Sequence, residues 1–320
     1  MGDEKILYLN DTVIKHILTW DTLVPAIENM LYAGSNREET DTLQPHRISM
    51  KIPSKPQGSL LLCMPAYCGK EHAFGCKVIS SFPQNKEKGI PSINGLVILL
   101  DTETGRLKMI LDAIEITAWR TAAVSAVATK HMHKGEKKIL AILGAGVQGK
   151  SHALAMYSIF KFSQVRIWNR TSERAKALCA ELGPWAVPFE DREMCVRGAD
   201  VIVTVTFSTE TIVEAKWLKT GAHINAVGGM RGRYEADVDV YKRATIVVES
   251  LEHEDEDFKG LHAMGVKPLC EVGELIKGTR KMPDNKEFSV FHSLGMGLED
   301  IATAELIYNQ YMKRNEKQLL

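Results

Sequence analysis

The sequence predicts an α/β protein in which a Rossmann-type domain, with a doubly wound parallel sheet, is joined to a smaller α+β domain. Two observations carry this prediction. Short apolar runs alternate with helical segments through the middle of the 320-residue chain, which is typical of a doubly wound parallel sheet. A glycine-rich turn follows the first of these runs, where a Rossmann fold places its phosphate-binding loop.

The strands of the parallel sheet are expected where a short apolar run is bounded by turn residues. The helices between them show apolar residues spaced along one face. On this basis strands are predicted at residues 138–143, 164–168, 200–206, 222–227 and 244–248, and helices at residues 150–160 and 172–182.

The first part of the chain lacks this alternation and predicts a separate α+β domain. Residues 59–64 and 95–100 are strand-like, and residues 101–105 form a hairpin turn before a strand at 107–111. A helix over residues 118–131 is expected to join the domains. A last helix over residues 298–312 is expected to return to the first domain.

Composition argues against several classes of protein. Lys and Arg number 40, as do Asp and Glu, so no charge excess favours nucleic acid or a membrane surface. The six cysteines form no C-x-x-C pair, which favours reduced thiols in the cytoplasm and no metal site. The N-terminus lacks the apolar core of a signal peptide, and the acidic run at residues 252–257 is expected to be solvated.

The glycine-rich turn is the motif with the clearest chemistry. Gly144-Ala145-Gly146-Val147-Gln148-Gly149 fits G-x-G-x-x-G between a predicted strand and a predicted helix, the context that indicates dinucleotide binding. Gly144 permits the tight turn, Gly146 lets the backbone approach a pyrophosphate, and Gly149 lets the helix pack on the strand. A glycine turn without a ligand is the alternative.

The end of the second strand indicates which dinucleotide binds. An NAD site has Asp or Glu about 20 residues beyond the glycines, where it binds the ribose 2′-hydroxyl. Here the residue is Asn169, followed by Arg170 and Thr171. A guanidinium can bind a 2′-phosphate, which a carboxylate would repel. We therefore predict NADPH/NADP as the cofactor, with Arg170 as an ordinary surface residue being the alternative.

Several separate motifs resemble the ornithine cyclodeaminase/mu-crystallin family, in the same order and over nearly the whole chain. The likeness is strongest to the ketimine reductase branch of that family. The motifs are Gln44-Pro45-His46-Arg47, Met64-Pro65-Ala66-Tyr67, Arg120-Thr121-Ala122-Ala123, the glycine turn, residues 167–171, residues 221–228 and residues 293–300.

This resemblance implies a two-domain homodimer with the nicotinamide in the cleft between domains. Residues 1–118 with 294–320 would form the substrate-binding and dimerisation domain, and residues 119–293 the NADP-binding domain. Arg47, Lys77 and Arg120 match the family's basic residues that bind the substrate carboxylate. The positions that match cofactor-lining residues of the family are Thr121, Val147, Gln148, Asn169, Arg170, Thr171, Thr206, Val227 and Ser293.

One departure from the family pattern bears on the reaction. True cyclodeaminases carry an Asp just after a Val-Gly-Gly turn, whereas this chain has Met230, followed by Arg231. A thioether cannot act as a base or hold an ammonium group. With Met230 and Arg231 at the substrate, the resemblance implies an NADPH-dependent reductase of cyclic ketimine carboxylates.

The proposed chemistry assigns a role to each basic residue. Arg47 and Arg120 would hold the carboxylate over the nicotinamide, while Lys77, or a water beside it, would supply the imine proton. Internal ion pairs are the alternative for Arg47 and Arg120, and a plain surface position is the alternative for Lys77.

Other functions remain open at this point. An amino-acid dehydrogenase or N-alkyl amino-acid synthase could use the same pocket, as could an ornithine cyclodeaminase-type enzyme. A non-enzymatic thyroid-hormone-binding or crystallin role is the remaining alternative.

Overall fold

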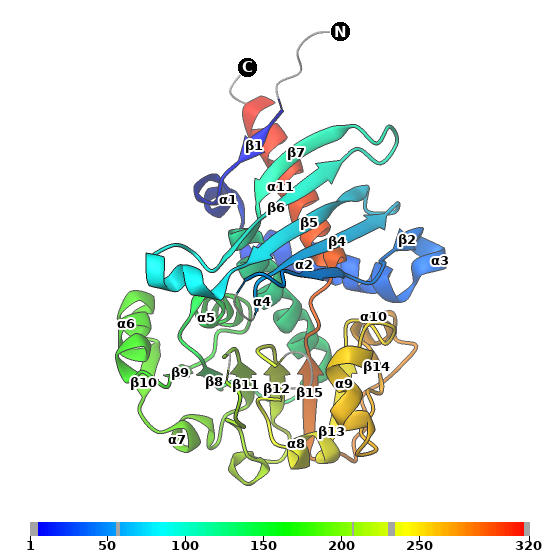
Figure 1. Cartoon of the computed structure of the whole chain (residues 1–320). Helices are drawn as coiled ribbons and strands as arrows, with labels where there is room; N and C mark the ends of the chain where they lie inside the picture. The colour runs from blue at the N-terminus through cyan, green and yellow to red at the C-terminus, as the bar shows by residue number, and fades with distance from the viewer. Residues whose placement is uncertain (1–5, 56–57, 207, 230–233, 317–320) are drawn as a thin grey trace. The chain divides into compact units, whose positions relative to one another are not determined.

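The computed structural model describes residues 6–55, 58–206, 208–229 and 234–316. The chain divides into two compact units (Figure 1). Unit 1 consists of Met1–Arg120 with Met296–Leu320, and unit 2 of Thr121–Gly295. The helix α4 (Ala113–Met132) begins in unit 1 and ends in unit 2.

Unit 1 is built on a mixed sheet whose strands run in the order β1-β7-β6-β5-β4-β2, with β3 paired to β4. All pairings are antiparallel except that of β1 with β7. Its strands are β1 (Tyr8–Leu9), β2 (Thr42–Leu43), β3 (Ile48–Lys51), β4 (Leu60–Cys68), β5 (Ala73–Ser81), β6 (Ile93–Leu100) and β7 (Leu107–Asp112).

One face of this sheet is buried because side chains alternate along each strand. Met64 and Ala66 of β4, and Val97 and Leu99 of β6, are buried. The long helix α11 (Gly297–Glu316) contacts β4, β5 and β6, and also α2 (Trp20–Ser35). The helices α1 (Asp11–Ile17) and α3 (Arg37–Thr40) and the 3₁₀ helix η1 (Pro83–Lys88) complete the unit.

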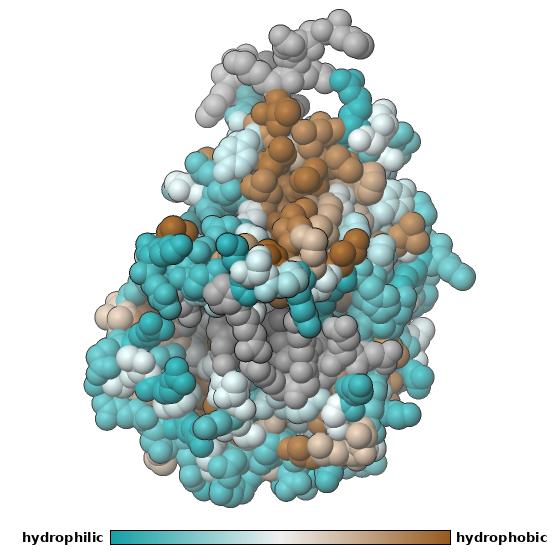
Figure 2. Space-filling view, viewed as in Figure 1, coloured by the Kyte–Doolittle hydropathy of each residue, from teal (hydrophilic) through white to brown (hydrophobic). Residues whose placement is uncertain are grey.

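The opposite face of the sheet is apolar and open. Figure 2 shows hydrophobic side chains gathered over the strands of unit 1. Ile98 lies opposite Ile110 in the register, and Cys63 lies opposite Val78. Leu96, which pairs with Val78, keeps 38% of its surface exposed.

Unit 2 has a parallel sheet with strand order β10-β9-β8-β11-β12-β15-β13-β14. All of its pairings are parallel. Its strands are β8 (Ile139–Leu143), β9 (Gln164–Trp168), β10 (Ala186–Phe189), β11 (Val201–Thr204), β12 (His223–Ala226), β13 (Ala244–Val248), β14 (Cys270–Glu271) and β15 (Phe288–His292).

The order of strands reverses beside β8, since the chain leaves β8 toward β9 and β10 and then returns to β11 on the other side. Such a switch point is where parallel sheets bind ligands, at the carboxyl ends of the strands. The helices of this unit, besides the end of α4, are α5 (Val147–Phe160), α6 (Ser172–Leu182), α7 (Arg192–Val196), α8 (Val238–Arg243), α9 (Asp255–His262) and α10 (Val272–Lys277), with the 3₁₀ helix η2 (Ala215–Trp217).

The predicted fold class is confirmed: a doubly wound parallel sheet is joined to a domain with a mixed sheet. The strand at residues 164–168, the strand at 244–248 and the helix at 172–182 begin and end as predicted. The helix predicted over 118–131 begins earlier, at Ala113. Within the described ranges, no helix is both long and apolar enough to cross a bilayer.

Candidate functional site

The glycine turn of unit 2 has the geometry that a phosphate-binding loop needs. Gly144 adopts a φ of 126°, a conformation that side-chain-bearing residues rarely take. A Cβ atom on Gly149 would lie 2.0 Å from the carbonyl oxygen of Gly144, so the helix α5 packs closely on the turn. The space around Gly146 is open, because a Cβ atom on this residue would meet no other atom within 4 Å. A ligand can therefore approach the backbone at Gly146.

The helix α5 begins at this open position. Gly146 is its N-cap, and Val147, the first helical residue, is 60% exposed. The first turn of a helix presents backbone N–H groups and the positive end of the helix dipole. Gln148 follows on the same turn and is half-buried. These features make the start of α5 suited to an anionic ligand.

Asn169 connects the glycine turn to the end of β9. Its side-chain oxygen accepts a hydrogen bond from the backbone N–H of Ala145 at 3.1 Å, and its amide nitrogen donates to the Thr171 carbonyl at 2.9 Å. Both polar atoms of the Asn169 side chain are therefore hydrogen-bonded to the backbone. Arg170 and Thr171, by contrast, are exposed. We conclude that Asn169 shapes the turn, while Arg170 is accessible to a ligand.

Thr206 follows strand β11 and Val227 follows the neighbouring strand β12. The buried carboxylate of Glu235 is hydrogen-bonded to both segments. Glu235 accepts hydrogen bonds from the Thr206 backbone N–H at 2.8 Å, from the Thr206 hydroxyl and from the Gly228 N–H at 3.0 Å. Burial raises the pKa of Glu235, and the hydrogen bonds from Thr206 act in the opposite direction. This carboxylate fixes the spacing of the two strand ends.

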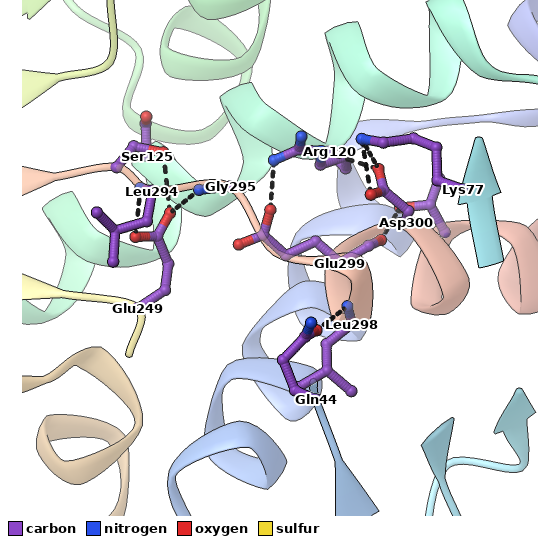
Figure 3. Close-up of polar contacts among 12 residues, drawn as sticks. Gln44, Lys77, Arg120, Ser125, Glu249, Leu294, Gly295, Leu298, Glu299 and Asp300 are labelled. Carbon is purple, nitrogen blue, oxygen red and sulfur yellow. Dashed lines mark hydrogen bonds and ion pairs between the residues drawn. The ribbon is translucent and has the colours of Figure 1, made fainter. Parts of the chain in front are cut away.

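Ser293 follows β15 and is held by a second buried carboxylate. Glu249 accepts from the Ser293 hydroxyl at 2.9 Å. It also accepts from the Leu294 N–H at 2.8 Å and from the Gly295 N–H at 3.3 Å (Figure 3). Burial raises the pKa of Glu249, and these three donors oppose that shift. Thr121 is buried on α4. Met230 and Arg231, predicted to contact the substrate, lie outside the described residues.

Lys77 of unit 1 is a buried cation, not a surface lysine. It lies on β5 with only 1% of its surface exposed, and its Nζ is 2.8 Å from Oδ1 and 2.7 Å from Oδ2 of Asp300 (Figure 3). Burial lowers the pKa of Lys77 to about 8, while the charge of Asp300 raises it. A lysine in this range can both hold and release a proton near neutral pH.

Arg120 shares the same carboxylate. Its Nε lies 3.1 Å from Oδ1 of Asp300, and its Nη1 donates to Glu299. Lys77, Arg120, Glu299 and Asp300 thus form a buried cluster with two positive and two negative groups. The internal ion pair that was the alternative for Arg120 is therefore present. Arg47 precedes β3 and is half-buried.

The start of α11 supplies both carboxylates of this cluster. Its first turn carries Glu299 and Asp300, and the backbone N–H of Leu298 donates to the side chain of Gln44 at 2.8 Å (Figure 3). Gly297 lies against β4, since a Cβ there would be 2.8 Å from the Met64 carbonyl oxygen. The glycine permits this close approach and so places the two acids beside the sheet.

Four functional candidates were not predicted from the sequence: Glu235, Glu249, Glu299 and Asp300. The last two stand in a motif that supported the family resemblance, but no role was assigned to them. The signal that could have identified Glu249 is a carboxylate directly after an apolar strand, in Val247-Val248-Glu249. Among the residues that the structure describes, no group of His, Cys, Asp or Glu side chains is arranged to hold a metal ion.

Comparison with known sequences is consistent with this geometry. Residues 4–315 match the ornithine cyclodeaminase/mu-crystallin family. The chain belongs to this family. The ketimine reductase mu-crystallin of Rattus norvegicus is 36% identical over 302 residues, covering 94% of this chain and 96% of that protein.

Solved structures of the same fold include two that resemble this member of the family along its length. The Delta(1)-pyrroline-2-carboxylate reductase of Thermococcus litoralis, in complex with NADH and L-proline, has a TM-score of 0.88 and 26% identity, covering 97% of this chain and 98% of that chain. An archaeal alanine dehydrogenase dimer with bound NAD has a TM-score of 0.87 and 27% identity, covering 97% of each chain.

Proposed function

We propose that this chain is an NADPH-dependent reductase of cyclic ketimine carboxylates. The observation that carries the proposal is the buried Lys77, held by Asp300 at hydrogen-bond distance with a pKa of about 8. An imine accepts hydride readily only when its nitrogen is protonated, so a reductase needs a proton donor matched to neutral pH. The ketimine reductase and pyrroline-carboxylate reductase named among the relatives support this reaction class.

The charges of the cluster suit the proposed substrate. Before proton transfer the ketimine carboxylate carries one negative charge, and the cluster of Lys77, Arg120, Glu299 and Asp300 carries two positive and two negative charges. When Lys77 gives its proton to the imine nitrogen, the substrate becomes a zwitterion and the cluster gains one net negative charge, which can pair with the iminium. We assign carboxylate binding to Arg47 and Arg120, and the iminium proton to Lys77 with Asp300 as its counter-charge.

The cofactor belongs to unit 2 in this proposal. The glycine turn and the start of α5 would hold the pyrophosphate, and Thr206, Val227 and Ser293 would contact the nicotinamide half. The bound dinucleotide supplies the hydride. The residues of the chain bind and orient the substrate carboxylate and hold the proton at Lys77 Nζ.

The preference for NADPH over NADH is part of the proposal and rests on Arg170. This residue is exposed directly after β9, beside Asn169 in the place of an acid. A guanidinium there offers charge-assisted hydrogen bonds to a 2′-phosphate. The Thermococcus litoralis and archaeal relatives are described with NADH and NAD, so the two cofactors must be compared directly.

We further propose a homodimer formed through the open face of the unit 1 sheet. That face carries Cys63, Val78, Leu96, Ile98 and Ile110 in adjacent register positions, and contiguous apolar surface of this kind marks interfaces. The archaeal relative is described as a dimer. Six free thiols fit a protein of the reducing cytoplasm.

The test is the oxidation of NADPH by the purified protein, followed by absorbance, with Δ1-piperideine-2-carboxylate and Δ1-pyrroline-2-carboxylate as substrates. We expect turnover with at least one imine and a higher kcat/KM with NADPH than with NADH. Absence of turnover with either imine and either cofactor contradicts the proposal. Turnover seen only with a 2-oxo acid and an added amine identifies an amino-acid dehydrogenase or N-alkyl amino-acid synthase instead.

A further inference from the structure

The Ser293 hydroxyl and the Glu249 carboxylate meet at the carboxyl edge of the unit 2 sheet. Glu249 directly follows β13 and Ser293 directly follows β15, and these two strands are parallel neighbours. The Ser293 Oγ lies 2.9 Å from Oε1 of Glu249. Both residues are buried, with 8% and 4% of their surfaces exposed. The pair therefore sits at the edge where parallel sheets bind their ligands.

The neighbouring backbone groups fix the direction of the hydrogen bond in this pair. The N–H of Leu294 donates to Oε2 of Glu249, and the N–H of Gly295 donates to Oε1. A backbone N–H can only donate, so both oxygens of Glu249 already act as acceptors. The remaining contact of this carboxylate is with Ser293, whose hydroxyl donates to Oε1. The Ser293 hydrogen is then directed at Glu249.

A hydroxyl whose hydrogen is committed keeps only its lone pairs for a ligand. We propose that Glu249 is a positioning residue that fixes the Ser293 hydroxyl as an acceptor for a hydrogen-bond donor of the bound cofactor. This inference rests on the proposed function for the identity of that cofactor. In the nicotinamide half of a dinucleotide the donors are the carboxamide amino group and the ribose hydroxyls, whereas phosphate oxygens only accept. Ser293 is accordingly not assigned to the pyrophosphate, and the proposed function places it at the nicotinamide half.

Glu249→Gln reverses the donor and acceptor roles at this position with little change of shape. The side-chain oxygen still accepts from Leu294, while the amide nitrogen, in the place of Oε1, donates to the Ser293 oxygen and leaves the Gly295 N–H without this acceptor. The Ser293 hydrogen is released and can be donated outward. The variant should therefore no longer favour a cofactor that presents a hydrogen-bond donor to Ser293. It should instead bind a cofactor that presents a carbonyl oxygen at this position.

The experiment measures Kd by quenching of tryptophan fluorescence for NADP⁺ and for its 3-acetylpyridine analogue, in which a methyl group replaces the carboxamide amino group. Wild-type protein should bind NADP⁺ more tightly than the analogue, by about tenfold, the effect of one hydrogen bond with its acceptor left unpaired. In Ser293→Ala and Glu249→Gln this ratio should fall to about one. Asp237→Asn is the matched control, since Asp237 also accepts backbone N–H groups in unit 2, from Ala215 and Val240, and its ratio should remain that of wild type.

The outcomes distinguish a carboxamide donor from a ribose-hydroxyl donor, and both from failure of the inference or of the proposed function. If Ser293→Ala and Glu249→Gln weaken both ligands by the same factor while Asp237→Asn does not, the donor is a ribose hydroxyl, and the assignment of Ser293 as an acceptor stands. If wild-type protein binds NADP⁺ and both variants bind the two ligands as wild type does, the inference is wrong. If wild-type protein binds no nicotinamide dinucleotide, the proposed function has failed instead. Ser293→Ala keeps the test decisive should Glu249→Gln not fold.

Discussion

The ammonium group of Lys77 lies within 2.8 Å of both carboxylate oxygens of Asp300, although the two residues are 223 positions apart in the sequence. Lys77 is 1% exposed and its partner is fully buried. Breaking a buried pair of this kind by removing one partner usually costs about 3–5 kcal/mol. The pair is thus both a structural contact of unit 1 and the proposed source of the proton.

Lys77→Arg should strongly slow imine reduction while preserving the ion pair. A guanidinium remains charged at all accessible pH values, so it can satisfy Asp300 but cannot give up a proton. We expect kcat to fall by about 10²–10⁴, the usual contribution of general acid–base catalysis. The Kd for NADPH should not change. Full activity in this variant would exclude Lys77 as the proton donor, and an equal loss of cofactor binding would indicate a structural role.

Asp300→Asn should move the pH profile of reduction to lower pH. Reduction requires protonated Lys77, so the wild-type rate should be highest below a pH of about 8 and should fall as the pH rises through that value. The Asp300 charge raises the pKa of Lys77, and its removal lowers that pKa further. The midpoint of the falling limb of kcat/KM should therefore lie at lower pH in the variant. An unchanged midpoint would show that another group is titrating.

Two glycines of the turn should respond differently to alanine. Gly149→Ala places a Cβ 2.0 Å from the Gly144 carbonyl oxygen, and such overpacking typically costs about 1–3 kcal/mol of stability. Gly146→Ala meets no atom within 4 Å and has a φ of −92°, which alanine accepts. Thermal unfolding should show a lower Tm for Gly149→Ala alone. Loss of dinucleotide binding without loss of Tm is expected for Gly146→Ala, and wild-type binding in that variant would argue against a pyrophosphate at this turn.

Arg170→Ala should weaken NADPH binding and leave NADH binding unchanged. Hydrogen bonds to charged groups contribute about 1.5–3 kcal/mol, which corresponds to roughly a 10- to 150-fold rise in Kd for NADPH. Arg174, which is exposed on α6, provides the control Arg174→Ala. Equal effects of the two substitutions, or equal effects of Arg170→Ala on NADPH and NADH, would contradict specific recognition of a 2′-phosphate.

Leu96→Asp should dissociate the proposed homodimer. Leu96 lies on the open apolar face of the unit 1 sheet and is 38% exposed. A carboxylate buried in an interface without a partner is strongly unfavourable. Light scattering after size-exclusion chromatography should give half the wild-type mass. Met194→Asp is the control, because Met194 is 58% exposed on α7 of unit 2, and it should leave the mass unchanged.

The parallel sheet could be predicted from the sequence because its strands are local apolar runs with clear ends. The strand at residues 164–168 and the helix at 172–182 have ends that are recognisable in the local sequence, and the structure has the same bounds. The helix α2 was not predicted, although its buried residues Leu23, Val24 and Ile27 follow a helical spacing. Its proline, Pro25, stands inside the helix and breaks the usual sequence pattern.

The site was predicted in part, for a physical reason. The glycine turn combines a local motif with a local structural context, so its residues could be named in advance. The carboxylates Glu235, Glu249 and Asp300 act through tertiary hydrogen bonds, to Gly228, Ser293 and Lys77 respectively. Contacts between residues that are distant in the sequence leave no periodic pattern by which they could be predicted. Arg120 was assigned to the substrate with an internal ion pair as the alternative, and in the fold it is the partner of Glu299.

Unit 1 is assembled from two distant pieces of chain, and this affects how the protein is made. Synthesis proceeds from the N-terminus, so the strands of the sheet leave the ribosome long before Met296–Leu320. Until α11 arrives, Lys77 lacks its partner Asp300, and the sheet lacks the helix that packs on β4, β5 and β6. Unit 2 is continuous and can fold first. Completion of the buried Lys77 cluster therefore waits for the synthesis of α11, and a chain that ends before this helix lacks both carboxylates of the cluster.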